Sequence, residues 1–431
     1  MPQGATDSSM NRAVAQAAPA SRLARKLGTA DAVVIGLGAM IGAGIFAVLG
    51  PAARAAGAGL LIGLLVAASV AYCNATSSAT LAALYPASGG TYVYGKERLG
   101  PFWGFLAGWG FVIGKLASCA AMALTFAYYA APSHARLLAV GAVAVLTGIN
   151  YLGVSKTAHA TRAIVVVVLA CLAIVVFAAL FGGHADLARA RPAPSAGAYG
   201  ILQAAGFLFF AFAGYARIAT LGEEVVDPAR TIPRAIPLAL AIALGVYAAV
   251  ALAALVALGP GELARSSAPL VAVVEGGRWS ALAPLVRVGA SVASLGVLLS
   301  LLAGVSRTAF SMAGSGDLPR FLASVHPRHR IPDRAELAVG AIVVAIVLVA
   351  DVRGAIGFSS FAVLVYYAVA NASALTLRAP QRRWPRSLAA AGLGGCALVA
   401  SSLPLASIAQ GVALLAAGAA VYAIRGWTGR R

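Results

Sequence analysis

The stretch GLGAMIGAGIF at residues 36–46 places four glycines inside an apolar run that extends from about residue 32 to 56. Such a run is long enough for a helix that crosses a bilayer core of roughly 30 Å. Glycine costs about 1 kcal/mol relative to alanine in a helix interior, so this helix is weak at its middle. Two explanations are open for this stretch alone. Gly38 and Gly42 form a GxxxG spacing that favours close helix packing, or the weak turn frees backbone groups for a ligand.

The composition of the chain is that of an integral membrane protein. Of its 431 residues, 61% are hydrophobic and 10% are charged, whereas soluble domains carry about 25% charged residues. Helices are the expected spanning element, because backbone polar groups in lipid need partners within the same segment. The four cysteines lie inside apolar runs, and we find no disulfide, metal-binding or nucleotide-binding pattern. We therefore expect no cofactor, no metal and no enzymatic activity.

The apolar runs predict an all-α protein with twelve membrane-spanning helices. We place these near residues 32–56, 59–84, 101–131, 137–154, 163–182, 199–221, 235–258, 281–311, 336–350, 355–377, 387–405 and 407–424. Residues 1–27 lack the features of a secretory signal and are expected to form a disordered cytoplasmic tail.

The net charge of +19 follows the expected topology. With the amino terminus inside the cell, 22 of the 32 Lys and Arg residues lie on the cytoplasmic side and eight on the other. An excess of Lys and Arg is typical of cytoplasmic loops. Both termini are therefore expected in the cytoplasm, in a multi-pass protein of the inner (plasma) membrane. The charge is thus a topology signal, and nucleic acid is not an expected partner. Lys115 and Arg217 are the two basic residues left inside spans.

A second weak span favours the ligand explanation for the glycines. The sixth span, GFLFFAFAGYARIATLGEE at 206–224, carries Gly214 between aromatic residues. Interrupted first and sixth spans, at matching positions of two five-helix halves, indicate an inverted-repeat transporter with its site near the membrane midplane. Amides freed near 41–44 can hold a carboxylate, and carbonyls around 209–213 suit an ammonium. Together they would hold an α-amino acid by its backbone.

Four segments, in this order, resemble the amino acid/polyamine/organocation transporter superfamily, whose members have the LeuT-type fold. They are GAMIGAGIF at 38–46, YPASGGTYVYGKERLGPFWGFLAGW at 85–109, FFAFAGYARIATLGEEVVDPARTIPRAI at 209–236 and GVSRTAFSMAGSGDLPRFLASVHPRHRIP at 304–332. The resemblance covers nearly the whole chain after residue 27. It implies a 5+5 inverted repeat, with repeats at 28–182 and 183–378, followed by two further helices and a short tail at 379–431.

The resemblance also implies which residues bind substrate. The first-helix backbone that would hold the carboxylate is Ile41, Gly42, Ala43 and Gly44, and the sixth-helix positions are Phe210, Ala211 and Ala213, with Tyr215 as an aromatic lid. Three positions depart from the patterns of the family. The fifth-helix lysine of proton-coupled relatives aligns with Val168. A third-helix acid found in some relatives aligns near Gly114, and a sixth-helix acid found in others aligns with Ala216 or Arg217.

The two basic residues inside spans are candidates for coupling or gating, because an intramembrane charge is costly unless it faces a cavity or a partner. Lys115 either titrates as a coupling cation or stays charged and caps carbonyls of a broken helix. Arg217 is more simply explained by an ion pair or inner gate with Glu223, Glu224 or a carboxylate of another loop than by substrate contact.

The acidic residues favour a neutral substrate. No Asp or Glu lies deep in any expected span, and Lys115 would repel a cationic side chain. We therefore expect a secondary transporter for neutral amino acids, with protons as the coupling ion and the lipid bilayer as its surroundings. The alternatives are an exchanger of basic amino acids or polyamines, and a substrate-sensing receptor. The short carboxy-terminal tail disfavours a sensor, and the sequence leaves the oligomeric state open.

Overall fold

The computed structural model describes residues 27–42, 44–85, 89–153, 158–191, 197–221 and 224–428. Ala43, Glu223 and the expected tail at 1–26 lie outside the described residues.

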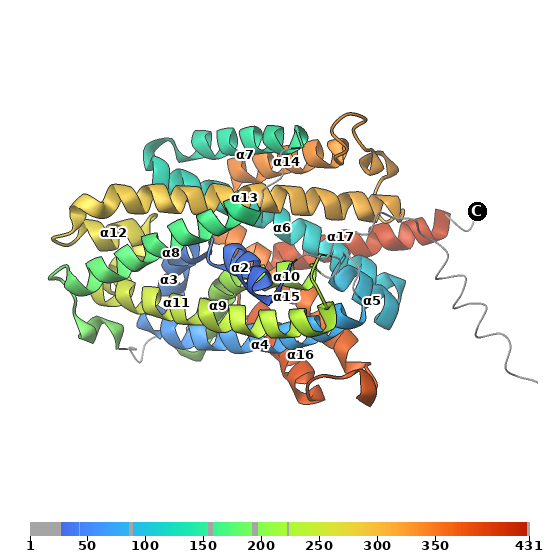
Figure 1. The fold of residues 1–431 in the computed structure, drawn as a ribbon, viewed down its shortest axis with the longest axis horizontal. Helices are drawn as coiled ribbons and strands as arrows, with labels where there is room; N and C mark the ends of the chain where they lie inside the picture. The colour runs from blue at the N-terminus through green and yellow to red at the C-terminus, as the bar shows by residue number, and fades with distance from the viewer. Residues whose placement is uncertain are drawn as a thin grey trace, which may run out of the picture.

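The described residues form helices joined by short connections (Figure 1), with no β-strand among them. In chain order the α-helices are α2 (Thr29–Met40), α3 (Gly44–Ala56), α4 (Leu60–Leu84), α5 (Thr91–Leu99), α6 (Pro101–Ala130), α7 (Ala135–Tyr151), α8 (Ala158–Phe181), α9 (Gly197–Phe212), α10 (Ala216–Ala219), α11 (Pro228–Arg265), α12 (Pro269–Glu275), α13 (Ala283–Gly314), α14 (Asp333–Val349), α15 (Val352–Leu375), α16 (Arg386–Ser401) and α17 (Leu405–Thr428). The short 3₁₀ helices are η1 (Gly57–Gly59), η2 (Pro132–His134), η3 (Leu187–Ala190), η5 (Ala213–Tyr215), η6 (Ser280–Leu282), η7 (Arg320–Ala323) and η8 (Ala379–Gln381).

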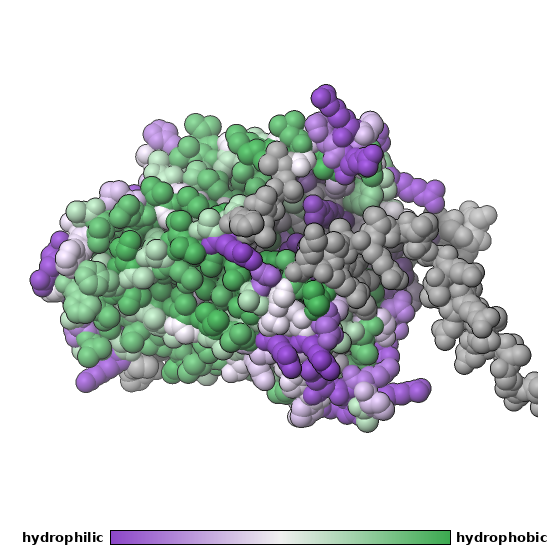
Figure 2. All heavy atoms as spheres, viewed as in Figure 1, coloured by the Kyte–Doolittle hydropathy of each residue, from purple (hydrophilic) through white to green (hydrophobic). Residues whose placement is uncertain are grey.

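Within the described ranges, nine helical segments are long and apolar enough to cross a membrane, judged by length and composition. They are Gly44–Leu84, Pro101–Ala130, Pro132–Tyr151, Ala160–Phe181, Gly197–Ala219, Pro228–Arg265, Ser280–Gly314, Val352–Leu375 and Leu405–Arg425. Figure 2 shows hydrophobic residues covering the middle of the molecule, with hydrophilic residues gathered at its two ends. Large apolar residues such as Leu137, Val166 and Val349 are exposed. A surface of this kind faces lipid rather than water.

The helices pack in two groups. One contains α2, α3, α4, α9 and α11, and the other contains α6, α7, α13 and α14, with α8 and α15 contacting both groups. Figure 1 shows α7 and α14 along one side of the molecule, α4 and α11 along the other, and α2 and α3 between them. The helices α2 and α3 are the two parts of the first expected span, so the interrupted span lies in the interior.

The helix α11 bends where the expected seventh span ends. Gly259 has a φ of +75°, a conformation that side chains other than glycine rarely adopt, and Pro260 follows it. The chain therefore leaves the span axis at this point and continues to Arg265 in a new direction. The span itself is the part of α11 before the bend.

Tyr129 on α6 links the two groups, because its buried hydroxyl donates to the Phe46 carbonyl (3.1 Å) and accepts from the Leu270 amide (3.3 Å). We expect Tyr129→Phe to lower the free energy of unfolding by about 1–3 kcal/mol, since both buried groups lose a partner. Thermal unfolding in detergent measures this effect. Tyr128→Phe is the matched control, because the Tyr128 hydroxyl has no hydrogen bond to the described residues. Equal midpoints for the two variants would contradict the prediction.

Candidate functional site

The first expected span is interrupted within the glycine-rich stretch. The helix α2 ends at Met40, Ile41 and Gly42 form a turn in which the Ile41 amide donates to the Leu37 carbonyl (2.7 Å), and α3 begins at Gly44. The first amides of a helix have no partner within it and form its positive end. The start of α3 therefore offers donors of the type that hold an anion.

The sixth expected span changes its winding opposite this turn. The helix α9 ends at Phe212, tightens into η5 and continues as the single turn α10. A 3₁₀ segment inside an α-helix alters the direction of the carbonyl groups next to it. Gly214 lies in the middle of this segment.

The two interruptions lie in backbone contact. A Cβ on Gly44 would lie 2.7 Å from the Ala211 Cα, and a Cβ on Gly214 would lie 2.3 Å from the Ala39 carbonyl oxygen. Both distances are too short for any side chain, and the obstructing atoms belong to backbone. The structure thus explains these two glycines by close approach: Gly44 lies next to Ala211, and Gly214 lies next to Ala39 and Met40.

Two sixth-span carbonyls are held by tyrosines from other helices. The Tyr247 hydroxyl of α11 donates to the Ala211 carbonyl (3.0 Å), and the Tyr367 hydroxyl of α15 donates to the Ala213 carbonyl (3.3 Å). A carbonyl oxygen has two lone pairs, so each can accept a second hydrogen bond. Sequence analysis missed both tyrosines. The available signal was a phenol inside an apolar span, which needs a buried partner.

The aromatic residues of the sixth span pack around Tyr367. Tyr215 is fully buried and stacks on the Tyr367 ring with centroids 5.0 Å apart, while Phe209 meets the same ring edge-on at 5.9 Å. The Tyr215 hydroxyl has no hydrogen-bond partner among the described residues. Phe210 is only partly buried. The expected lid residue Tyr215 is therefore part of the packed interior in this conformation.

The side chains that the first-span glycines face are uncharged. A Cβ on Gly36 would meet Ile218 and Ala239, one on Gly38 would meet Val165 and the methyl group of Thr161, and one on Gly42 would meet Val297. These side chains come from α10, α11, α8 and α13. The surroundings of the first-span interruption are therefore apolar at every one of these contacts.

Lys115 lies on α6 at the interface with α15. Its Nζ is 6.0 Å from the centroid of the Phe111 ring, a cation–π distance, and it forms no ion pair with any described residue. The neighbouring Gly114 packs against Ala362 of α15, where a Cβ would lie 2.8 Å from the Ala362 Cβ. Val168, the position of the lysine in proton-coupled relatives, is buried.

Arg217 does not form the expected ion pair with Glu224 in this structure. Its Nη1 donates instead to the Thr220 hydroxyl (3.4 Å), one turn further along the chain. Glu224 is held through its backbone, because its carbonyl accepts from the Leu27 amide (3.1 Å) while the Val226 amide donates to the Leu27 carbonyl (2.9 Å). This pairing connects the segment before α2 to the segment after α10. The start of the first interrupted span is therefore linked to the end of the sixth.

Glu336 is a buried acid whose environment sequence analysis did not predict. It lies in the first turn of α14, near the end of a span as expected, yet only 3% of it is exposed. Its carboxylate accepts hydrogen bonds from the side-chain amide of Asn150 (2.9 Å) and from the Ser306 hydroxyl. These donors come from α7 and α13, so the carboxylate joins three helices of the second group.

Asp317 lies in the loop after α13 and connects this loop to α5 and α17. It accepts from the Tyr92 hydroxyl of α5 (2.6 Å) and lies 3.5 Å from the Arg425 guanidinium of α17. Burial, with the hydrogen bond to Asp317, raises the pKa of Tyr92 to about 12. Tyr92 therefore remains a hydrogen-bond donor at physiological pH.

Comparison with known proteins identifies the class to which this arrangement belongs. Residues 27–424 match the family model described as amino acid permease. A protein of Mycobacterium tuberculosis named as an uncharacterized transporter is 62% identical over 405 residues, which cover 94% of this chain and 92% of the relative. The branched-chain amino acid permease of Bacillus subtilis is 28% identical over 334 residues (72% and 71%), and human cationic amino acid transporter 4 is 28% identical over 393 residues (85% and 61%).

Proposed function

Because this chain belongs to the amino acid permease family, a family of multi-pass membrane transporters and not of enzymes, we propose that it carries neutral amino acids by alternating access. The observation that carries the proposal is the backbone contact between the two interrupted spans. Where the two interruptions face each other, the start of α3 provides amide donors and the sixth span provides carbonyl acceptors. An α-amino acid presents both partners, a carboxylate and an ammonium.

The proposed substrate-binding groups follow from that geometry. The amides around Ile41, Gly42, Ala43 and Gly44 would hold the carboxylate. The carbonyls of Ala211 and Ala213 would accept from the ammonium, beside the hydrogen bonds that Tyr247 and Tyr367 already donate to them. Phe210 and Tyr215 would contact the side chain of the substrate.

The substrate side chain is proposed to be neutral and apolar. The contacts of Gly36, Gly38 and Gly42 are with aliphatic and hydroxyl side chains, and no carboxylate is among them. A cationic side chain would need such a partner to offset its desolvation. A relative named as a branched-chain amino acid permease agrees with this choice, whereas a relative named as a cationic amino acid transporter supports the runner-up.

The proposed topology has twelve spans in the cytoplasmic membrane with both termini inside. Residues 28–182 and 183–378 would form the two repeats, and α16 and α17 would be the two further helices. In this arrangement the helices that contact both groups, α8 and α15, are the fifth and tenth spans. Movement of one group against the other around the paired interruptions would expose the site to each side in turn.

Uptake into proteoliposomes tests the function directly. A panel of labelled amino acids is offered with and without an inward proton gradient. Accumulation of neutral amino acids only with the gradient is the expected result. Gradient-independent exchange of arginine, lysine or polyamines would establish the runner-up instead.

Lys115 is the residue to test for a role in coupling. If Lys115 carries the coupling charge, Lys115→Met should bring the ratio of uptake with and without the proton gradient to about one, because coupling requires a group that responds to both ligands. Lys96→Met on α5 is the matched control, since it makes the same change at an exposed lysine outside the spans. An unchanged gradient dependence in Lys115→Met would assign Lys115 a structural role.

A further inference from the structure

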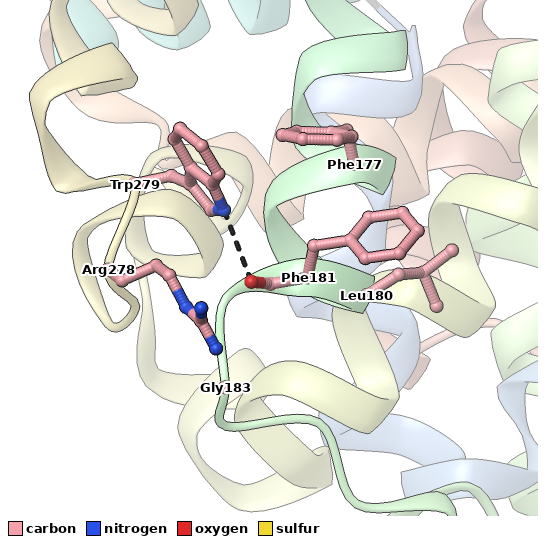
Figure 3. Close-up of a pocket in the computed structure, with 6 residues that line it drawn as sticks. All are labelled: Phe177, Leu180, Phe181, Gly183, Arg278 and Trp279. Carbon is pink, nitrogen blue, oxygen red and sulfur yellow. Dashed lines mark hydrogen bonds between the residues drawn. The ribbon is translucent and has the colours of Figure 1, made fainter.

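A groove lies at the end of the molecule opposite α5, where α8 ends beside the loop that follows α12. It has a volume of about 410 Å³ and is shallow rather than enclosed. Figure 3 shows its lining, which consists of Phe177, Leu180, Phe181, Gly183, Arg278 and Trp279. None of these residues belongs to the proposed substrate site.

The walls of the groove are held by defined contacts between two segments far apart in sequence. The Trp279 Nε1 donates to the Phe181 carbonyl (3.1 Å; Figure 3), and the Arg278 amide donates to the Gly182 carbonyl (3.2 Å). The Phe177 ring contacts both neighbouring aromatic rings, with centroids 5.2 Å from Trp279 and 5.1 Å from Phe181. The groove is therefore formed by the packing of these segments.

The Arg278 guanidinium at the groove has no protein partner within the described residues. The nearest acid along the chain, Glu275, is already paired with Arg287 of α13 at 2.8 Å. Gly183 lets the guanidinium lie against the chain, because a Cβ there would be 3.2 Å from Nη2. An exposed arginine with five free donors beside apolar side chains is suited to a phosphate group, which guanidinium binds through paired hydrogen bonds.

The opposite side of the groove is apolar and lies on a spanning helix. Phe177, Leu180 and Phe181 are 42%, 54% and 59% exposed, and they lie in the last turns of the apolar segment Ala160–Phe181. The end of such a segment lies at the boundary between hydrocarbon and headgroups, where tryptophan is also enriched. Arg278 and the exposed apolar side chains thus lie together at the end of a candidate membrane span, where lipid headgroups are expected.

We propose that this groove binds one anionic phospholipid. Its phosphate contacts the Arg278 guanidinium, its glycerol lies beside Trp279, and one acyl chain follows Phe177, Leu180 and Phe181. The occupant is a lipid rather than free phosphate because four of the six lining residues, Phe177, Leu180, Phe181 and Trp279, offer apolar surface that an acyl chain covers. Its net charge is negative because no acid among the described residues pairs with Arg278.

Native mass spectrometry of the delipidated full-length protein in detergent tests the proposal. Dioleoyl-phosphatidylglycerol, dioleoyl-phosphatidylethanolamine and sodium phosphate are titrated separately. We expect one tightly retained phosphatidylglycerol, and about fivefold weaker retention in Arg278→Gln because a charge-assisted contact is lost. Arg265→Gln at the end of α11 is the matched control, since it removes the same charge from an exposed arginine outside the groove.

The apolar track is tested with Leu180→Gln combined with Phe181→Gln, which should also weaken phosphatidylglycerol retention. Equal retention by the unsubstituted protein and Arg278→Gln would overturn the proposal. Equal retention of phosphatidylethanolamine would also overturn it, because the site would then not select a net negative charge. Binding of sodium phosphate that survives the Leu180 and Phe181 substitutions would overturn it as well, because the site would then not require an acyl chain. Uptake activity does not enter this readout, so it can fail or succeed independently of the proposed transport function.

Discussion

Replacement of Gly44 by alanine is expected to reduce amino acid uptake by more than about tenfold. A Cβ there would lie 2.7 Å from the Ala211 Cα and 2.9 Å from the Ala211 Cβ. The start of α3 would have to move away from α9, and an overpacked interior costs about 1–3 kcal/mol even where the fold tolerates it. The movement would separate the proposed carboxylate donors from the proposed ammonium acceptors.

Binding affinity in detergent, measured beside uptake, separates a lost site from a lost fold. Gly304→Ala on α13 is the matched control, because a Cβ there meets nothing within 4 Å. Ala211→Gly in the Gly44→Ala background removes one of the two obstructing atoms and should restore part of the affinity, a coupling that a double-mutant cycle measures. Wild-type affinity in Gly44→Ala would refute the proposed position of the site.

Replacement of Gly214 by alanine is expected to abolish uptake and to lower the thermal midpoint as well. The obstructing atoms are the Ala39 carbonyl oxygen and carbon, at 2.3 and 2.4 Å, and the Met40 amide nitrogen at 2.7 Å. All belong to the backbone of α2, so no side chain can turn aside. The end of α2 would be displaced from η5, and with it the link between the two interrupted spans.

This second effect should resist rescue, in contrast to that of Gly44→Ala. Shortening a neighbouring side chain removes none of the obstructing atoms, so no single large-to-small substitution around Gly214 should restore uptake. Gly245→Ala on α11 is the control, since a Cβ there also meets nothing within 4 Å. Normal uptake by Gly214→Ala would show that α2 and the sixth span need not be in contact during transport.

The family and the helical, membrane-spanning character of the chain could be predicted from its residues. Hydropathy is a property of one segment, so the expected spans 101–131 and 163–182 lie close to α6 and α8. The cost of glycine in a helix is equally local, so the interruption between Met40 and Gly44 falls in the stretch that the sequence marks as weak. The substrate, the coupling ion and the proposed site residues stay predictions.

Only the tertiary structure decided which groups meet. Tyr247 and Tyr367 donate to the carbonyls of Ala211 and Ala213 from positions 36 and 154 residues away in the chain. Contacts of this kind depend on how separate helices pack, because no local preference for a helix specifies which neighbour its polar groups will face. Sequence therefore determined where the helices are weak, and packing determined what lies opposite each weak point.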